Sequence, residues 1–332
     1  MDLTERVLAG DRLALARLLT LLENDQPEGH DGLAALYSRT GHARIVGVTG
    51  ASGTGKSTLV NRLALALRAA ERAQTVGIVA VDPSSPYTGG AILGDRIRMR
   101  DLAGDPGVFI RSMASRGALG GLARTTFSVV EALDAAGFDM VLIETVGAGQ
   151  TEVDIARMAH TTIVVDAPGL GDDVQAIKAG ILEIADILVV NKADLPGADH
   201  AIQLLRASLQ MAHPTRHEWA HHGLSEGPAA PPAESTWLPP VLPTVATQGE
   251  GVPALVEALE QHRAYLLKTG ELALRQRERA RAELESLLRD QLAARWRVAQ
   301  PDGRFDAALE RVVRREVAPR RAAADLAETG KG

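Results

Sequence analysis

The 332-residue chain is predicted to fold as an α/β protein around a mostly parallel, doubly wound sheet. Short, almost continuous apolar runs of strand length alternate with segments of helical spacing through the middle of the chain. Such runs are typical of parallel strands, because helices cover both faces of a parallel sheet. Aromatic residues make up only 3% of the chain, so leucine, valine, isoleucine and alanine must form most of the core.

The first expected element is helical and covers residues 3–24, where leucines and Val7 form one apolar stripe. The predicted strands follow at residues 45–49, 76–81, 108–110, 140–143, 162–165, 187–190 and 241–245. Helical patterns lie between most of them, at residues 57–72, 119–136, 173–185 and 202–211. Strand and helix therefore alternate in the order that a parallel sheet requires.

The last third of the chain departs from this alternation. Residues 212–240 are rich in proline, glycine and polar residues, which predicts a long surface loop. Helical patterns then cover residues 252–267, 272–296 and 305–317. Leu284, Leu288, Leu292 and Trp296 recur every four residues in the second of these, an apolar stripe that suits either a core or a dimer contact.

Composition excludes several functional classes. The net charge of −6 argues against nucleic acid as the main partner. The chain has no cysteine, so it has neither disulfides nor thiolate metal sites nor a cysteine nucleophile. The charged N-terminus is unlike a secretory signal, and no run of about 18 apolar residues predicts a membrane span. We therefore expect a cytoplasmic protein without membrane or nucleic-acid partners.

The sequence GVTGASGTGKST at residues 47–58 predicts a phosphate-binding loop, because it matches G-x-x-x-x-G-K-[ST] between a strand and a helix. Glycines let backbone N–H groups turn toward an anion, and the helix N-terminus adds partial positive charge. Lys56 is expected to reach the β- and γ-phosphates, and Ser57 to hold Mg²⁺. The expected nucleotide-binding residues here are Gly50, Ala51, Ser52, Gly53, Thr54, Gly55, Lys56, Ser57 and Thr58.

A second motif indicates which base is bound. Asn191, Lys192 and Asp194 form an Asn-Lys-x-Asp quartet directly after an apolar strand. A carboxylate can accept hydrogen bonds from both N1–H and the 2-amino group of guanine, and adenine lacks this donor pair, so Asp194 predicts GTP. Asn191 and Lys192 would support the base and the loop. Backbone groups that could contact the guanine oxygen lie in Val245, Ala246 and Thr247.

Acidic residues at strand ends are candidates for the metal site. Asp82 and Glu144 each end a predicted strand, and Asp95 lies in the segment ILGDRIRM. Each alone could simply cap a turn, but carboxylates on the phosphate side are the groups that steer Mg²⁺ and water. Gly147 would let a switch loop move when the γ-phosphate is lost.

Together these motifs resemble the MeaB family of P-loop GTPases, which includes the methylmalonic aciduria type A protein and ArgK. The resemblance covers about residues 5–297 and rests on GVTGASGTGKST, VDPSSPYTGGAILGDRIRM, SRGALGGL, ETVGAGQTE, GDDVQAIKAG and VVNKAD. It implies a SIMIBI-type G domain at 41–268, a helical extension at 1–40 and a helical dimerisation arm at 269–332. The loop at residues 212–238 is longer than the resemblance leads one to expect.

The resemblance also implies a role. Proteins of this family are homodimeric GTPases that gate adenosylcobalamin loading of acyl-CoA mutases, methylmalonyl-CoA mutase above all, and protect or reactivate the mutase. It places Asp82, Asp95 and Glu144 at positions associated with Mg²⁺ and hydrolysis. Lys178 falls in a third switch segment, and we hypothesise that it moves toward the phosphates when the mutase binds.

Two other functions compete with this interpretation. A nickel-insertion GTPase of hydrogenase or urease maturation shares the phosphate loop, but it relies on cysteine and histidine motifs, and this chain has no cysteine. An ATP-dependent small-molecule kinase is opposed by the quartet that ends at Asp194. Four histidines in the proline-rich loop, at positions 213, 217, 221 and 222, have a spacing that could bind a metal only in a stable helix.

Overall fold

The computed structural model describes residues 2–71, 73–83, 99–102, 104–115, 121–145, 151–169, 182–212, 236–299 and 303–328. They divide into two compact units, Met1–Arg279 and Ala280–Gly332. The larger unit contains the sheet and the smaller one is helical.

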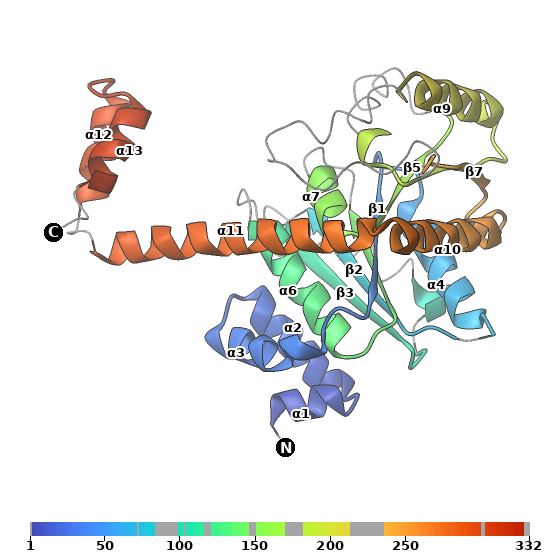
Figure 1. Ribbon diagram of the computed structural model, residues 1–332, viewed down its shortest axis with the longest axis horizontal. Helices are drawn as coiled ribbons and strands as arrows, with labels where there is room; N and C mark the ends of the chain where they lie inside the picture. The colour runs from blue at the N-terminus through green and yellow to red at the C-terminus, as the bar shows by residue number, and fades with distance from the viewer. Residues whose placement is uncertain are drawn as a thin grey trace. The chain divides into compact units, whose positions relative to one another are not determined.

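A parallel sheet of seven described strands forms the centre of the larger unit (Figure 1). The strand order is β3-β2-β4-β1-β5-β6-β7, and every pairing is parallel. The strands are β1 (Arg44–Thr49), β2 (Val76–Pro83), β3 (Val108–Ser115), β4 (Met140–Thr145), β5 (Thr161–Asp166), β6 (Ile187–Asn191) and β7 (Val241–Thr244). The predicted parallel α/β fold is therefore confirmed, with β3 longer than its apolar run indicated.

Helices cover both faces of this sheet, as its apolar strands require. On one face α4 (Lys56–Ala69) and α10 (Val252–Thr269) bury Leu59, Leu63 and Leu255 against Val46 and Ile78. The other face is covered by α6 (Gly121–Ala135), α7 (Thr151–Met158) and α9 (Ala198–Ala212). Because all the described strands run in the same direction, their carboxyl ends meet at one edge of the sheet, and the glycine loop and the Asn-Lys-x-Asp quartet follow two of these ends.

Residues 3–24 form two helices rather than one, and a third helix follows them. They are α1 (Leu3–Leu8), α2 (Arg12–Glu23) and α3 (Pro27–Leu36). Gly10 has a φ of 80°, and Asp11 caps α2 by accepting hydrogen bonds from the N–H groups of Leu13 and Ala14. The apolar stripe of α2 packs into the same core as α6, so these helices belong to the larger unit.

The long helix α11 (Glu271–Ala299) begins in the larger unit and continues into the smaller one. Within the smaller unit, the indole N–H of Trp296 donates to the carbonyl oxygen of Leu326 at 3.0 Å. The predicted helix 305–317 is shorter than expected: α12 (Arg304–Val313) ends first, and α13 (Pro319–Glu328) starts at a proline, which suits a first helical position. Among the described residues, no helix combines the length and hydropathy that a membrane span requires.

Candidate functional site

The glycine loop joins β1 to α4 at the carboxyl edge of the sheet. Gly50, Gly53 and Gly55 have φ values of 137°, 81° and 89°, a region that L-residues with a side chain rarely adopt. A Cβ atom on Gly50 would lie 2.0 Å from the carbonyl oxygen of Val165 on β5. The loop thus has the backbone that a phosphate cradle needs, pressed against a neighbouring strand.

Gly55 is confined by a second neighbour. A Cβ atom there would lie 2.4 Å from Nδ2 of Asn191, whereas a Cβ on Gly53 would meet no atom within 4 Å. We expect Gly55→Ala to lower the free energy of unfolding by about 3 kcal/mol, since it adds a clash to backbone strain, and Gly53→Ala by about 1 kcal/mol from strain alone. Urea unfolding without nucleotide measures both. Equal losses in the two variants would contradict the assigned contact.

Lys56 is buried at the start of α4. Its Nζ donates hydrogen bonds of 2.9 Å to the carbonyl oxygens of both Gly50 and Ala51, and so closes the loop on itself. Thr54 Oγ1 donates to the same carbonyl of Ala51 at 3.0 Å. The ammonium group is therefore held beside the loop, and a phosphate bound there would offer it charged oxygen acceptors, which form stronger hydrogen bonds than carbonyl groups do.

Ser57 and Glu144, two of the residues expected at a metal site, contact each other. The serine Oγ donates to Oε1 of Glu144 at 2.5 Å, and both residues are buried. Glu144 belongs to β4, which pairs with β1, so its carboxylate reaches the first turn of α4. A hydroxyl and a carboxylate oxygen are suitable ligands for Mg²⁺ together with water and phosphate.

The remaining expected switch and metal residues are less fully described. Asp82 lies near the carboxyl end of β2, where its backbone pairs with Ala114 of β3. Asp95, Gly147 and Lys178 lie outside the described residues, as do the four histidines at 213–222. In the part of the chain that the structure describes, no group of three or more acidic or histidine side chains could hold a metal ion.

The quartet after β6 contacts the phosphate loop directly. Asn191 Nδ2 donates to the carbonyl oxygen of Thr54 at 2.7 Å, and Lys192 Nζ donates to that of Gly53 at 2.8 Å. Lys192 has a φ of 57°, so the chain turns sharply there and leaves Asp194 exposed. The predicted base-recognition and phosphate-binding segments therefore form one site.

Asn191 also holds the turn after β7. Its Oδ1 accepts hydrogen bonds from Thr244 Oγ1 at 3.1 Å and from the N–H of Ala246 at 3.0 Å. The turn is closed by a hydrogen bond of 3.1 Å from the N–H of Val245 to the carbonyl oxygen of Glu250. Asn191 thus connects the phosphate loop to the segment 245–247 that was predicted to contact guanine.

One residue of this site belongs to no sequence motif. Arg62, on α4, donates from Nη2 to the carbonyl oxygen of Thr247 at 2.9 Å and so supports the turn after β7. An arginine on the outer face of a helix carries no motif, and the contact joins segments far apart in the chain. The sequence offered no signal for it.

A strand, a glycine loop and a helix that begins with a buried lysine, next to an Asn-Lys-x-Asp quartet two strands away, define a P-loop GTPase. Residues 15–301 match the family described as methylmalonyl-CoA mutase-associated GTPase MeaB, and the chain belongs to this family. The expectation of a MeaB-family GTPase is confirmed.

Individual relatives agree with this assignment. A putative GTPase of Pyrococcus abyssi is 44% identical over 97% of this chain and 94% of its own length. The GTPase ArgK of Escherichia coli is 36% identical over 80% of this chain and 77% of its own length, and the methylmalonic aciduria type A homolog of Caenorhabditis briggsae is 30% identical over 88% and 70%. A crystal structure described as an LAO/AO transport system kinase superposes with a TM-score of 0.68 at 26% identity, over 99% of this chain and 97% of that one.

Proposed function

We propose that this GTPase is a chaperone of an adenosylcobalamin-dependent acyl-CoA mutase, with methylmalonyl-CoA mutase as the first candidate. The observation that carries the proposal is the match of residues 15–301 to a family described by its association with that mutase. The similarity to a methylmalonic aciduria type A homolog supports it. In this role GTP hydrolysis would time the loading of the cofactor and the release of the mutase.

The phosphate end of the site would act by positioning and charge. Lys56 would exchange its hydrogen bonds to the carbonyl groups of Gly50 and Ala51 for phosphate oxygens, which are better acceptors for an ammonium group. Ser57 and Glu144, with Asp82 and Asp95, would hold Mg²⁺. The metal would supply positive charge beside the β- and γ-phosphates, which Gly50–Gly55 would surround with backbone N–H groups.

The base end would choose GTP over ATP. Asp194 would accept two hydrogen bonds from guanine, while Asn191 keeps the loop and the turn at 245–247 in register with it. In this proposal the chemistry would take place near α4, and the end of β6 would provide the specificity for the base. We also propose that Lys178 approaches the phosphates when the mutase is bound, as a finger supplied by the same chain.

The arm helix supports a homodimer in this proposal. Leu284, Leu288 and Leu292 of α11 are 68%, 54% and 56% exposed, so an apolar stripe at helical spacing faces outward in the single chain. A second arm would bury such a stripe. Light scattering across a hundredfold range of concentrations, compared with a Leu288→Glu variant, tests this part.

The function is tested by GTP turnover with purified methylmalonyl-CoA mutase. We expect about tenfold or greater stimulation by the mutase, and Lys178→Ala to remove it, because a charge supplied at the transition state acts only in the complex. The matched control is Lys268→Ala, because Lys268 is an exposed lysine of α10, and this variant should keep the stimulation. If none of methylmalonyl-, isobutyryl- and ethylmalonyl-CoA mutase stimulates GTP turnover, the chaperone role is rejected. If Lys178→Ala is stimulated as strongly as the parent, the proposed role of Lys178 is rejected.

A further inference from the structure

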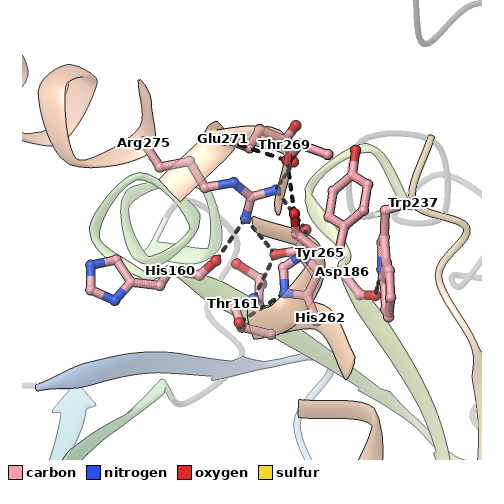
Figure 2. A network of polar contacts seen from close by, with 10 residues as sticks. His160, Thr161, Asp186, Trp237, His262, Tyr265, Thr269, Glu271 and Arg275 are labelled. Atoms are coloured by element: carbon pink, nitrogen blue, oxygen red, sulfur yellow. Dashed lines mark hydrogen bonds and ion pairs between the residues drawn. The ribbon is translucent and has the colours of Figure 1, made fainter. Parts of the chain in front are cut away.

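A buried polar cluster lies at the opposite edge of the sheet from the nucleotide site (Figure 2). Its centre is Asp186, which immediately precedes β6 and is 4% exposed. β6 therefore has Asp186 before its first residue, and Asn191 of the quartet as its last. The cluster and the base-recognition motif are separated by one short strand.

The carboxylate of Asp186 is contacted by an arginine, a histidine and a backbone N–H group. Arg275 of α11 donates from Nη1 to Oδ2 and from Nη2 to Oδ1, both at 2.9 Å, in a bidentate pair. The N–H of Thr162 in β5 donates to Oδ2 at 2.8 Å. Nε2 of His262 in α10 lies 3.3 Å from Oδ1. One side chain thus joins β5, α10 and α11 to the start of β6.

Two further contacts extend the cluster. His262 is fully buried, and its Nδ1 lies 2.9 Å from Thr161 Oγ1. The indole N–H of Trp237 donates to the backbone carbonyl oxygen of Asp186 at 2.7 Å, and its ring lies 4.8 Å from that of His262 (Figure 2). Trp237 comes just before β7, so both neighbours of β6 in the sheet are connected to the cluster.

Arg275 is also fixed from a second side. Its Nη1 donates to the carbonyl oxygen of His160 at 2.8 Å, and Glu271 of the first turn of α11 lies 4.0 Å from its Nη2. A planar guanidinium with a carboxylate on one edge and a carbonyl on the other can occupy only a narrow range of positions. Directed contacts therefore hold the start of α11 to the sheet.

A buried ion pair is an inefficient way to gain stability, because desolvation offsets most of the attraction. Its directed geometry does, however, specify where the partners lie. We propose that Asp186 and Arg275 are positioning residues that couple the start of the arm helix to guanine recognition through β6. The strand is five residues long and hydrogen-bonded to β5 and β7 on its two sides, so a shift at its amino end reaches Asn191 as a rigid displacement.

The test compares Arg275→Met with Arg277→Met, an exposed arginine two residues along the same helix, in the full-length protein. We expect Arg275→Met to raise the KM for GTP about fivefold while kcat changes less than twofold, and Arg277→Met to change neither. Amide exchange should rise together along β6, at residues 187–191, and in residues 241–246, which form β7 and the start of the turn after it. Arg275→Lys keeps the positive charge but loses the bidentate hydrogen bonding of the guanidinium, so its KM for GTP should lie between those of the parent and Arg275→Met. It is the variant to measure if Arg275→Met does not fold.

Two results would overturn the proposal. The first is faster exchange confined to α10 and α11 with an unchanged KM, which would make the cluster a structural anchor alone. The second is a parallel fall of kcat and kcat/KM in Arg275→Met and Arg277→Met alike. No mutase enters the experiment, so its outcome is independent of the proposed chaperone role.

Discussion

Asp194→Asn is expected to weaken GTP binding about 100-fold, because it removes two charge-assisted hydrogen bonds to guanine. The same change should create affinity for xanthosine triphosphate, whose 2-oxo group can accept a hydrogen bond from an amide side chain but is repelled by a carboxylate. Asp194 is exposed just beyond the turn at Lys192, and Asn191 is fixed at the end of β6, so the substitution leaves the support of the motif intact. Titration with a fluorescent GTP analogue, with XTP and ATP as competitors, measures the exchange of specificity.

Asp199→Asn is the matched control for this experiment, since Asp199 is another exposed carboxylate, in the first turn of α9. It alters the local charge by the same amount and should leave the affinity for GTP within about twofold. An Asp194→Asn protein that bound GTP as tightly as the parent and gained nothing for XTP would remove the case for guanine recognition by this residue.

The phosphate loop could be predicted in detail because everything it needs is contiguous in the chain. The positive φ values of Gly50, Gly53 and Gly55 and the helix that starts at Lys56 are consequences of twelve consecutive residues. The parallel strands could also be predicted, because a strand that is buried on both faces of a sheet has an almost continuous apolar sequence. Local sequence sufficed where local sequence determines the backbone.

Other features, such as a helix break and the cluster around Asp186, could not be predicted, because they depend on contacts or conformations that no sequence pattern indicates. The break between α1 and α2 required the conformation of Gly10 and the cap by Asp11, while the apolar stripe continued across both helices. Asp186 reaches Arg275 across 89 positions, and Thr161 reaches His262 across 101. In the sequence Asp186 is an ordinary acid before a strand, and only tertiary structure shows that it is buried against Arg275 and His262.

This burial leads to the second large effect. Asp186→Asn is expected to lower the free energy of unfolding by about 3 kcal/mol at pH 7, since the guanidinium of Arg275 loses the carboxylate that compensates its charge in a desolvated place. The amide can still accept a hydrogen bond from the N–H of Thr162 through one oxygen, so the shape of the site is kept. Urea unfolding of the two proteins measures the difference, with Asp31→Asn, an exposed acid of α3, as the control expected to change stability by less than about 0.5 kcal/mol.

The pH dependence gives this prediction its sharper test. Burial by itself would raise the pKa of the Asp186 carboxyl, but hydrogen bonds and positive charge from His262 and Arg275 hold that pKa well below the usual value. A carboxyl with a depressed folded-state pKa stabilises the fold fully above its unfolded pKa of about 4 and loses this contribution as the pH falls through the folded value. The difference between the parent and Asp186→Asn should therefore be constant from pH 7 to about pH 5 and shrink below pH 4.

His160 also makes stability depend on pH, but it does so equally in the parent and in Asp186→Asn. Burial, followed by the positive charges of Arg279 and Arg275, lowers its pKa to about 4, so both proteins should lose stability together between about pH 6.5 and 4 as the unfolded imidazole takes up its proton. That shared loss cancels in the difference between parent and variant, whereas the contribution of Asp186 does not. A difference that already declined between pH 7 and 5, or that stayed constant down to pH 3, would show that the carboxylate of Asp186 is not the charge that Arg275 stabilises.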